Sequence, residues 1–142
     1  MEYNQKIPLL RPYIDPDNRG FWEGVREHRL VFQECRYCGL IVHRPRPMCP
    51  RCLSTDRDWR ASTGKGHIYS YVNVAYQNVA YPGIKVPYTV VVVQMEEGVR
   101  LLSNLLDVEP KDVYIGMPVE ITFEDIADDL TLPMFRQRKT TQ

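Results

Sequence analysis

The first third of the chain predicts an extended arm, a short helix and two short strands. Three prolines keep residues 1–16 extended, because proline restricts φ and removes a backbone donor. Polar residues at 17–18 offer a helix cap, and Phe21, Trp22 and Val25 share one face of the amphipathic helix expected next. Whether these aromatics pack on the following segment or face a partner stays open. The apolar run at 30–34 predicts a strand, and the run at 40–43 predicts its return.

From residue 64 onward the pattern changes to strands separated by turn residues. The strand expected at 67–77 would place Ile68, Ser70, Val72 and Val74 on one face, with tyrosines 69 and 71 on the other. The strand expected at 87–95 contains four consecutive valines, which predicts a central strand covered on both faces.

Three further strands complete this half of the chain. A hairpin turn at 96–98 leads into a strand at 99–106, a short connection at 109–114 follows, and alternation at 119–124 predicts the next strand. Residues 132–138 predict the last one. Five strands in about 75 residues fit a Greek-key barrel of the OB type. The predicted fold is mainly β: an arm and helix at 1–29, a zinc ribbon at 30–62 with Trp59 as its cover, and a five-stranded OB-fold barrel at 63–142.

Four cysteines carry the strongest chemical signal. Cys35 and Cys38, and then Cys49 and Cys52, are each separated by two residues, so that two tight turns can direct four thiolates at one metal ion. Such a closed site is structural and leaves no coordination position for substrate. Zinc is the expected ion; a rubredoxin-like iron site uses the same ligands and is the less favoured alternative.

The expected compartment supports a metal rather than disulfides. The N-terminus has no apolar run long enough for a signal peptide, and no later segment approaches a membrane span. These observations predict a cytoplasmic protein without membrane attachment. In the reducing cytoplasm, cysteines remain thiols unless a metal holds them.

Charge is unevenly distributed in this chain of 142 residues with zero net charge. Residues 35–60 carry six arginines and two aspartates, a net charge of plus four, whereas residues 61–142 have a net charge of minus three. Arginines beside the ribbon can hold phosphates of a nucleic acid or of a nucleotide-bearing cofactor, or can simply pair with nearby acids.

Catalytic motifs are absent from the sequence. His28, His43 and His67 have no neighbouring serine or cysteine in a nucleophile motif, and there is no glycine-rich phosphate loop. We therefore expect a binding protein with no catalytic residues of its own. The loop at 78–86 carries Tyr81 and Lys85, which could stack on a base and meet a phosphate.

Several motifs in order resemble a known family over residues 17–136. They are Phe21-Trp22-Glu23-Gly24 before Leu30, Cys35-x-x-Cys38-Gly39, Pro45-Arg46 before Cys49-Pro50-x-Cys52, Gly66-x-Ile68-Tyr69-Ser70, Pro87-Tyr88, Glu97-Gly98-Val99-Arg100 and Ile115-Gly116-x-Pro118-Val119. Together they resemble the acyl-CoA-associated OB-fold family with a rubredoxin-like zinc ribbon, a former domain-of-unknown-function family. Leu53 stands where that family usually has glycine, which questions the geometry of the second cysteine turn.

The resemblance implies a non-catalytic subunit of a thiolase-like enzyme that degrades acyl-CoA. The partner would be a thiolase, a thiolase-fold aldolase or an archaeal thiolase and hydroxymethylglutaryl-CoA synthase assembly, in a hetero-oligomer that binds coenzyme A or acyl-CoA. Residue type and loop position, rather than matched family contacts, suggest as coenzyme A contacts Arg44, Arg46, Tyr81, Lys85, Tyr88 and Arg100.

Two alternatives belong to other functional classes. A zinc ribbon with an OB barrel is also common in nucleic-acid-binding modules, although the acidic barrel argues against that use. An independent acyl-CoA hydrolase or transferase is disfavoured by the missing nucleophile and base.

Overall fold

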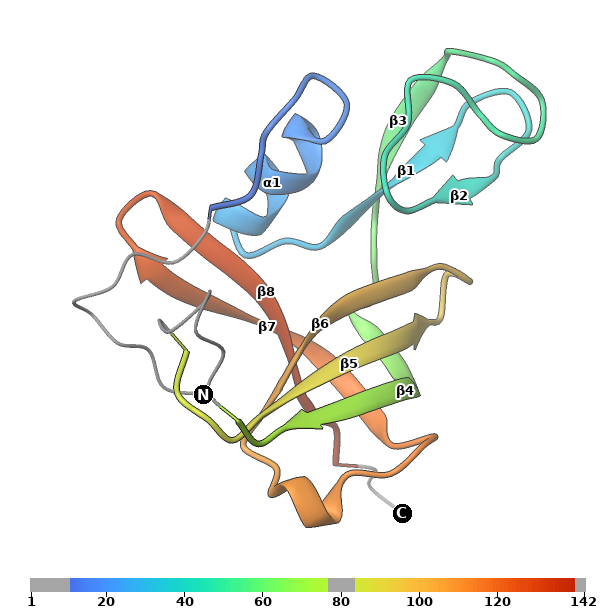
Figure 1. Cartoon of the computed structure of the whole chain (residues 1–142). Helices are drawn as coiled ribbons and strands as arrows, with labels where there is room; N and C mark the ends of the chain where they lie inside the picture. Colours follow the sequence, from blue (N-terminus) through green and yellow to red (C-terminus); the bar gives the residue numbers. More distant parts are fainter. Residues whose placement is uncertain (1–10, 77–83, 140–142) are drawn as a thin grey trace.

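The computed structural model describes residues 11–76 and 84–139, which form a helix, a small sheet and a closed barrel in chain order (Figure 1). The elements are α1 (Arg19–Arg26), β1 (Val31–Cys35), β2 (Ile41–Val42), β3 (Arg57–Ala61), β4 (Lys65–Val74), β5 (Tyr88–Met95), β6 (Arg100–Leu106), the 3₁₀ turn η1 (Pro110–Asp112), β7 (Pro118–Ala127) and β8 (Leu130–Gln137). The mainly β fold with one N-terminal helix confirms the predicted class.

Helix α1 is the amphipathic helix that the sequence predicts. Phe21, Gly24 and Val25 are buried on one face, and Trp22 packs half-buried beside them. The side chain of Asp15 accepts backbone hydrogen bonds from residues 17 and 18, which shapes the turn before the helix. The helix is therefore anchored by one apolar stripe, as expected of a surface helix.

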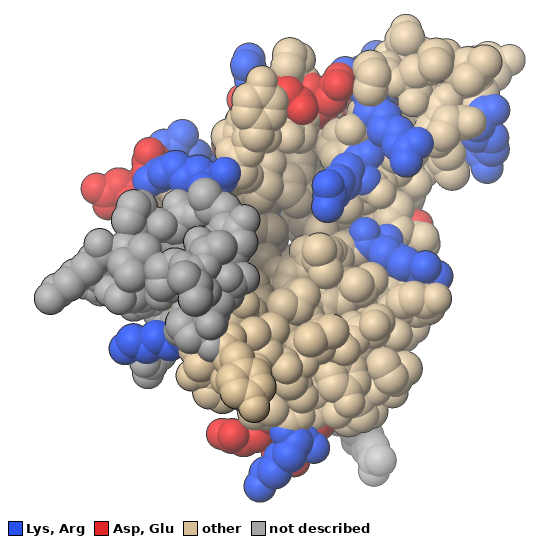
Figure 2. All heavy atoms as spheres, in the orientation of Figure 1, with Lys and Arg blue, Asp and Glu red and all other residues tan. Residues whose placement is uncertain are grey.

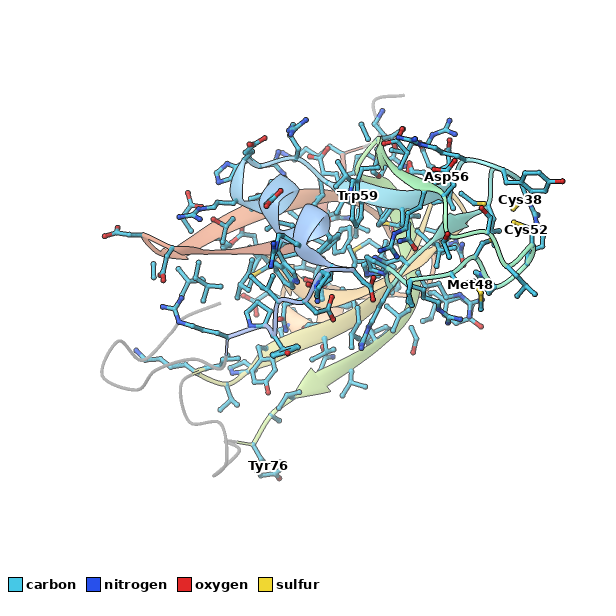
Figure 3. The ribbon with its side chains drawn as sticks, turned by 90° about the horizontal axis from the view of Figure 1, so that it is seen from above. Cys38, Met48, Cys52, Asp56, Trp59 and Tyr76 are labelled. Atoms are coloured by element: carbon cyan, nitrogen blue, oxygen red, sulfur yellow. The ribbon has the colours of Figure 1, made fainter. Side chains whose placement is uncertain are left out.

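A three-stranded antiparallel sheet, in the order β2-β1-β3, makes up the ribbon. Strand β3 was not predicted, because its sequence RDWRA shows no apolar alternation and four of its five residues are exposed. It nevertheless pairs with β1 along its full length. Trp59 of β3 lies against α1, where a Cβ atom on Gly20 would come within 2.3 Å of the indole (Figure 3). The interpretation of Trp59 as a cover for the ribbon therefore missed its contact with the helix.

The second half of the chain is a closed five-stranded barrel in the order β4-β5-β6-β8-β7. All neighbouring pairs are antiparallel except β6 and β8, which are parallel. The closure between β4 and β7 and the crossover after β6 give the Greek-key arrangement expected of an OB fold. The predicted barrel is confirmed.

Two expectations about strand faces were wrong. A bulge between Ile68 and Ser70 shifts the register of β4 against β5, so that Tyr71 packs against the core while Val72 is 60% exposed. A bulge inserts an extra residue and thereby reverses which face the following side chains occupy. Strand β5 has a paired neighbour on each side, as every strand of the closed barrel does, but only alternate residues are fully buried: Val91 and Val93 point inward, whereas Val90 and Val92 are half-buried outside.

One hydrophobic cluster joins the three parts of the molecule. Phe21, Val25, Leu30 and Phe32 from the helix and ribbon belong to the same cluster as the barrel interior, whose fully buried members include Phe135. The cluster holds the parts as one body. Within residues 11–76 and 84–139, no helix has the length and apolar character that a membrane span requires.

Candidate functional site

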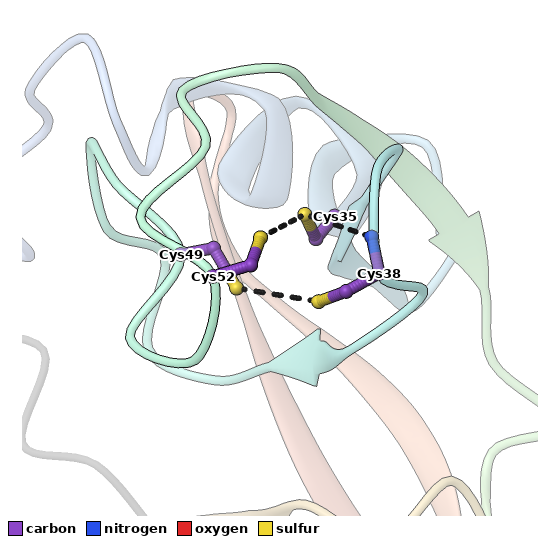
Figure 4. A group of neighbouring side chains, drawn as sticks. All are labelled: Cys35, Cys38, Cys49 and Cys52. Carbon is purple, nitrogen blue, oxygen red and sulfur yellow. Dashed lines mark hydrogen bonds between the residues drawn. The ribbon is translucent and has the colours of Figure 1, made fainter.

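The four cysteines converge at the end of the ribbon that lies far from Tyr76 (Figures 3 and 4). Their Sγ atoms all lie within 4.8 Å of one another, with Cys35 to Cys52 at 3.5 Å and Cys38 to Cys49 at 3.6 Å. These distances are far longer than a disulfide bond of about 2.05 Å. They suit a tetrahedral site, in which metal–sulfur bonds of about 2.3 Å place the sulfurs roughly 3.8 Å apart.

The two cysteine turns have the same backbone hydrogen bonds. In the first turn, the N–H of Gly39 donates to the carbonyl of Cys35; in the second, the N–H of Leu53 donates to the carbonyl of Cys49. Gly39 has φ +78° and Leu53 has φ +66°, so both occupy the left-handed region. Leu53 therefore reproduces the geometry of glycine, at the steric cost that a Cβ atom brings to this conformation.

The protein lowers the pKa of two of the thiols and raises that of a third. The backbone N–H of Leu40, with a smaller contribution from Arg51, lowers the pKa of Cys38 to about 6. The N–H of Ser54 lowers the pKa of Cys52, but burial and the neighbouring thiols outweigh it and raise that pKa to about 12. The first thiolate therefore raises the pKa of the neighbouring thiols until a cation is bound. A divalent metal ion is the cation that suits four thiolate donors.

Arg51 ties the two cysteine turns together. Its guanidinium donates a hydrogen bond of 2.8 Å to the carbonyl oxygen of Cys38, although Arg51 itself lies between Cys49 and Cys52. Proximity to Cys38 raises the pKa of Arg51. Its positive charge therefore stays beside a cage that would carry excess negative charge with four thiolates around a divalent ion.

Gln33 holds the loop between the two turns and was given no role in the sequence analysis. Its side chain is buried, accepts a hydrogen bond from the backbone N–H of Arg46 and donates one to the carbonyl of Arg46. An amide side chain can satisfy a backbone donor and acceptor together. A glutamine in an apolar strand was the available signal, because a buried amide needs partners.

A cleft of about 260 Å³ is lined by residues of the helix, the ribbon and the barrel. It is lined by Pro12, Tyr13, Asn18, Phe21, Trp22, His43, Arg44, Pro45, Leu101, Leu102 and Pro133. Burial, and then the charge of Arg44, lower the pKa of His43 to about 4. The ring of His43 packs beside Phe21 and Phe32. The imidazole of His43 is thus uncharged and contributes an aromatic ring to the wall of the cleft.

The ribbon arginines divide into those that pair with acids and those that do not. Three form ion pairs: Arg36 with Asp56 and Asp58, Arg57 with Asp17, and Arg60 with Glu34. Arg44 and Arg46 are exposed, and no ion pair joins either to another residue of the described chain. The interpretation that the ribbon arginines simply pair with nearby acids therefore holds for three of the six.

The barrel contributes one more candidate, Arg100, which is not among the residues that line the cleft. The guanidinium of Arg100 stacks over the ring of Tyr69 at 3.8 Å and donates to the side-chain oxygen of Gln94. Arg100 shares the outward face of β6 with Leu102, which lines the cleft. Figure 2 shows the hollow above the barrel, with Lys and Arg side chains along its ribbon side.

The other candidates lie elsewhere. Tyr88 begins β5 and Arg100 pairs with Gln94 of the same strand, so Tyr88 is about 20 Å along the strand from that end. Lys85 lies three residues before Tyr88 in sequence, and Tyr81 falls outside the described residues. The structure thus places Arg44 in the wall of the cleft, with Arg46 two residues further along and Arg100 outside its lining, and leaves Lys85 and Tyr88 at the far end of the barrel.

Two family models match the two halves of the chain. Residues 22–57 match "ChsH2, rubredoxin-like zinc ribbon domain", and residues 59–124 match "ChsH2, C-terminal OB-fold domain". A DUF35 domain-containing scaffold protein of Methanocaldococcus jannaschii is 34% identical over 112 residues, which cover 76% of this chain and 77% of that protein. The chain belongs to the DUF35 family. Its four-cysteine cage is accordingly a structural metal site.

Relatives outside the scaffold group are longer. A probable enoyl-CoA hydratase alpha subunit of Thermomonospora curvata is 40% identical over 135 residues, which cover 95% of this chain and 42% of that protein. This DUF35 chain spans about two fifths of the length of the hydratase alpha subunits it matches.

A solved structure has the same arrangement of ribbon and barrel. A chain of the structure described as the Ltp2-ChsH2(DUF35) aldolase superposes with a TM-score of 0.85 and 38% identity, over 89% of this chain and 98% of that one. The match includes nearly the whole of the other chain, so that the helix, ribbon and barrel are shared as one unit.

Proposed function

We propose that this DUF35 protein is a non-catalytic subunit that binds coenzyme A or acyl-CoA and stabilises a thiolase-fold catalytic subunit in acyl-CoA degradation. In this role Cys35, Cys38, Cys49 and Cys52 hold one zinc ion that keeps the ribbon rigid. The catalytic groups belong to the partner subunit, and the two proteins form a hetero-oligomer in the cytoplasm.

The likeness to the chain of the Ltp2-ChsH2(DUF35) aldolase carries this proposal. At 38% identity over almost the whole of that chain, the surfaces that meet a partner are expected to be similar as well as the fold. The relatives described as scaffold proteins support a role in assembly. The relatives described as hydratase alpha subunits support an acyl-CoA substrate for the complex.

The unpaired arginines support coenzyme A as the ligand. Coenzyme A carries three phosphates, and guanidinium groups bind phosphate through charge-assisted hydrogen bonds. Arg44 and Arg46 lack acidic partners within the described chain, and the pairing of Arg100 with Gln94 and Tyr69 consumes no negative charge. Arginines whose charge is not neutralised by an acid are suited to an anionic ligand.

Isolation of the tagged full chain from its native source tests the assembly. We expect a partner of thiolase size that peptide mass spectrometry identifies as a member of the thiolase superfamily, at a fixed stoichiometry after gel filtration. The complex should degrade acyl-CoA and the isolated chain should not. Thioester turnover by the pure chain, or a partner from outside that superfamily, would contradict the proposal.

Metal content and nucleic acid are measured on the same preparation. Native mass spectrometry should find one zinc ion per chain, whereas iron would give a coloured protein with a thiolate charge-transfer band. Nucleic acid that co-purifies and is released by salt would favour the nucleic-acid-binding alternative, because phosphate contacts weaken as salt rises.

A further inference from the structure

The cleft between helix, ribbon and barrel has the size for one part of a cofactor rather than the whole. Its volume of about 260 Å³ lies just below the range of about 300–1,000 Å³ of pockets that enclose drug-sized ligands. Coenzyme A is larger than such ligands, so that only one of its ends can enter. The chemistry of the walls decides which end fits.

Aromatic rings dominate the walls on the ribbon and helix side. Tyr13 is 84% exposed at the mouth, and Trp22 is half-buried with its ring edge-on to Phe21 at 5.2 Å. The uncharged ring of His43 continues this wall. Flat π-faces of this kind stack on a nucleic base and contribute about 1–3 kcal/mol per base. A flexible pantetheine chain would gain no such stacking.

One positive charge lies beside these rings, and no acidic residue of the described chain lines the cleft with it. Arg44 lines the cleft from the ribbon and has no ion pair with a described residue. An adenine nucleotide places a flat base next to phosphates, which is the combination these walls complement.

We propose that the cleft binds the adenine end of coenzyme A, with the base against the rings of Tyr13 and Trp22 and a phosphate at Arg44. The inference rests on the proposed function as a coenzyme A-binding subunit and specifies which end of the cofactor this chain holds. The pantetheine arm then leaves the cleft toward the catalytic subunit. Adenine binding thereby positions the thioester without any contribution from this chain to the chemistry.

Calorimetry on the full chain with two halves of the cofactor tests the assignment. Adenosine 3′,5′-bisphosphate should bind, and pantetheine should bind at least about tenfold more weakly. The Arg44→Ala variant should weaken bisphosphate binding by about tenfold or more, since a charged hydrogen bond is lost. Arg36→Ala is the matched control: Arg36 is an exposed ribbon arginine that pairs with Asp56 and Asp58, so its loss should leave affinity unchanged.

A tyrosine pair tests the stacking. Tyr13→Ala should weaken bisphosphate binding by about fivefold or more. Tyr37→Ala should have no effect, because Tyr37 is equally exposed, at 82% against 84% for Tyr13, but lies in the first cysteine turn. Both tyrosines are surface residues, so neither change should unfold the chain.

The outcomes separate this inference from the proposed function. In one outcome, the chain captures its partner while Tyr13→Ala and Arg44→Ala leave the affinity for the bisphosphate unchanged. That result would overturn the assignment of the adenine site to the cleft and would keep the proposed subunit role. Absence of bisphosphate binding to the full chain would also overturn the cleft, whatever the partner. Equal affinity for 5′-AMP and the bisphosphate would assign a general adenine nucleotide site instead, and a preference for single-stranded RNA would assign a nucleic-acid surface.

Discussion

The ribbon and the barrel are stabilised in different ways. In the barrel, inward side chains from all five strands meet in one apolar interior whose members Ile68, Val91, Val93, Val119 and Phe135 are completely buried. The ribbon buries few apolar side chains, and its strand β3 is almost wholly exposed. The ribbon therefore depends on its cysteine cage for a stability that the barrel obtains from apolar burial.

The difference shows how a short chain can carry a rigid extension. Burial of a large side chain contributes about 1.5–3 kcal/mol, whereas a structural zinc site contributes about 10–16 kcal/mol to folding of the segment around it. A segment of some thirty residues can thus keep a defined shape next to the barrel. The ribbon in this shape forms one wall of the cleft.

The largest expected effect on the difference between ribbon and barrel comes from loss of the metal. Cys35→Ser should abolish zinc binding and unfold the ribbon while the barrel keeps its structure, because the barrel core includes none of the cysteines. Hydrogen exchange should become fast in β1–β3 and stay slow in β5. Met48→Ser, an exposed change in the same ribbon, should leave the metal bound. Slow exchange in β1 without metal would show that apolar contacts alone hold the ribbon.

The converse experiment removes apolar volume from the barrel. Phe135→Ala creates a cavity at a side chain with 0% exposure and should lower the free energy of unfolding by about 3–5 kcal/mol. The zinc content of the folded variant should stay at one ion per chain. Val72→Ala, at 60% exposure, is the control and should change stability by less than about 0.5 kcal/mol. A loss of zinc in folded Phe135→Ala would mean that the two regions are not independent.

A change in pH probes the contact between ribbon and helix at His43. The pKa of His43 is lowered from 6.5 to about 4, by burial and then by Arg44, so the unfolded chain binds a proton that the folded chain does not between these values. Stability from this group is complete above pH 6.5 and is lost as pH falls toward 4, by up to about 3 kcal/mol.

Chemical denaturation across this pH range measures the effect. His43→Phe keeps an aromatic ring between Phe21 and Phe32 and should remove this part of the pH dependence. Acid also releases metal from thiolates in both proteins, so the difference between them isolates the histidine. Identical pH profiles would contradict the assignment.

The smallest expected effect concerns the two cysteine turns. Leu53 has φ +66° and is 64% exposed, so Leu53→Gly relieves backbone strain without loss of packing. Strain of about 1–2 kcal/mol is partly offset by the greater freedom of glycine in the unfolded chain, which leaves a gain of about 0.5–1 kcal/mol. Gly39→Leu should destabilise the first turn by a similar amount. Competition with a chelator measures the metal affinity of both variants. Weaker metal binding by Leu53→Gly than by the parent protein would contradict this reasoning.

Local patterns predicted the elements whose signals lie within a few residues. Helix α1 and the five barrel strands followed from periodicity, and the cysteine cage followed from paired two-residue spacings. Strand β3 was missed because its edge position leaves it without an apolar pattern. The faces of β4 were misjudged after Ile68, because a bulge depends on pairing with β5 and leaves no mark in β4 itself.

The sequence by itself determined the cysteine site and the order of helix, ribbon and barrel, because thiolate spacing and apolar period are local properties of the chain. Only the tertiary structure decided which arginines keep their charge free: Arg36, Arg57 and Arg60 meet acids, whereas Arg44 lines a cleft that has no acidic residue among the described residues of its wall. The same is true of the cleft itself, whose walls come from residues 12–22, 43–45, 101–102 and 133. Such distant segments are brought together by the shared hydrophobic cluster, and their proximity is not encoded in any single stretch of sequence.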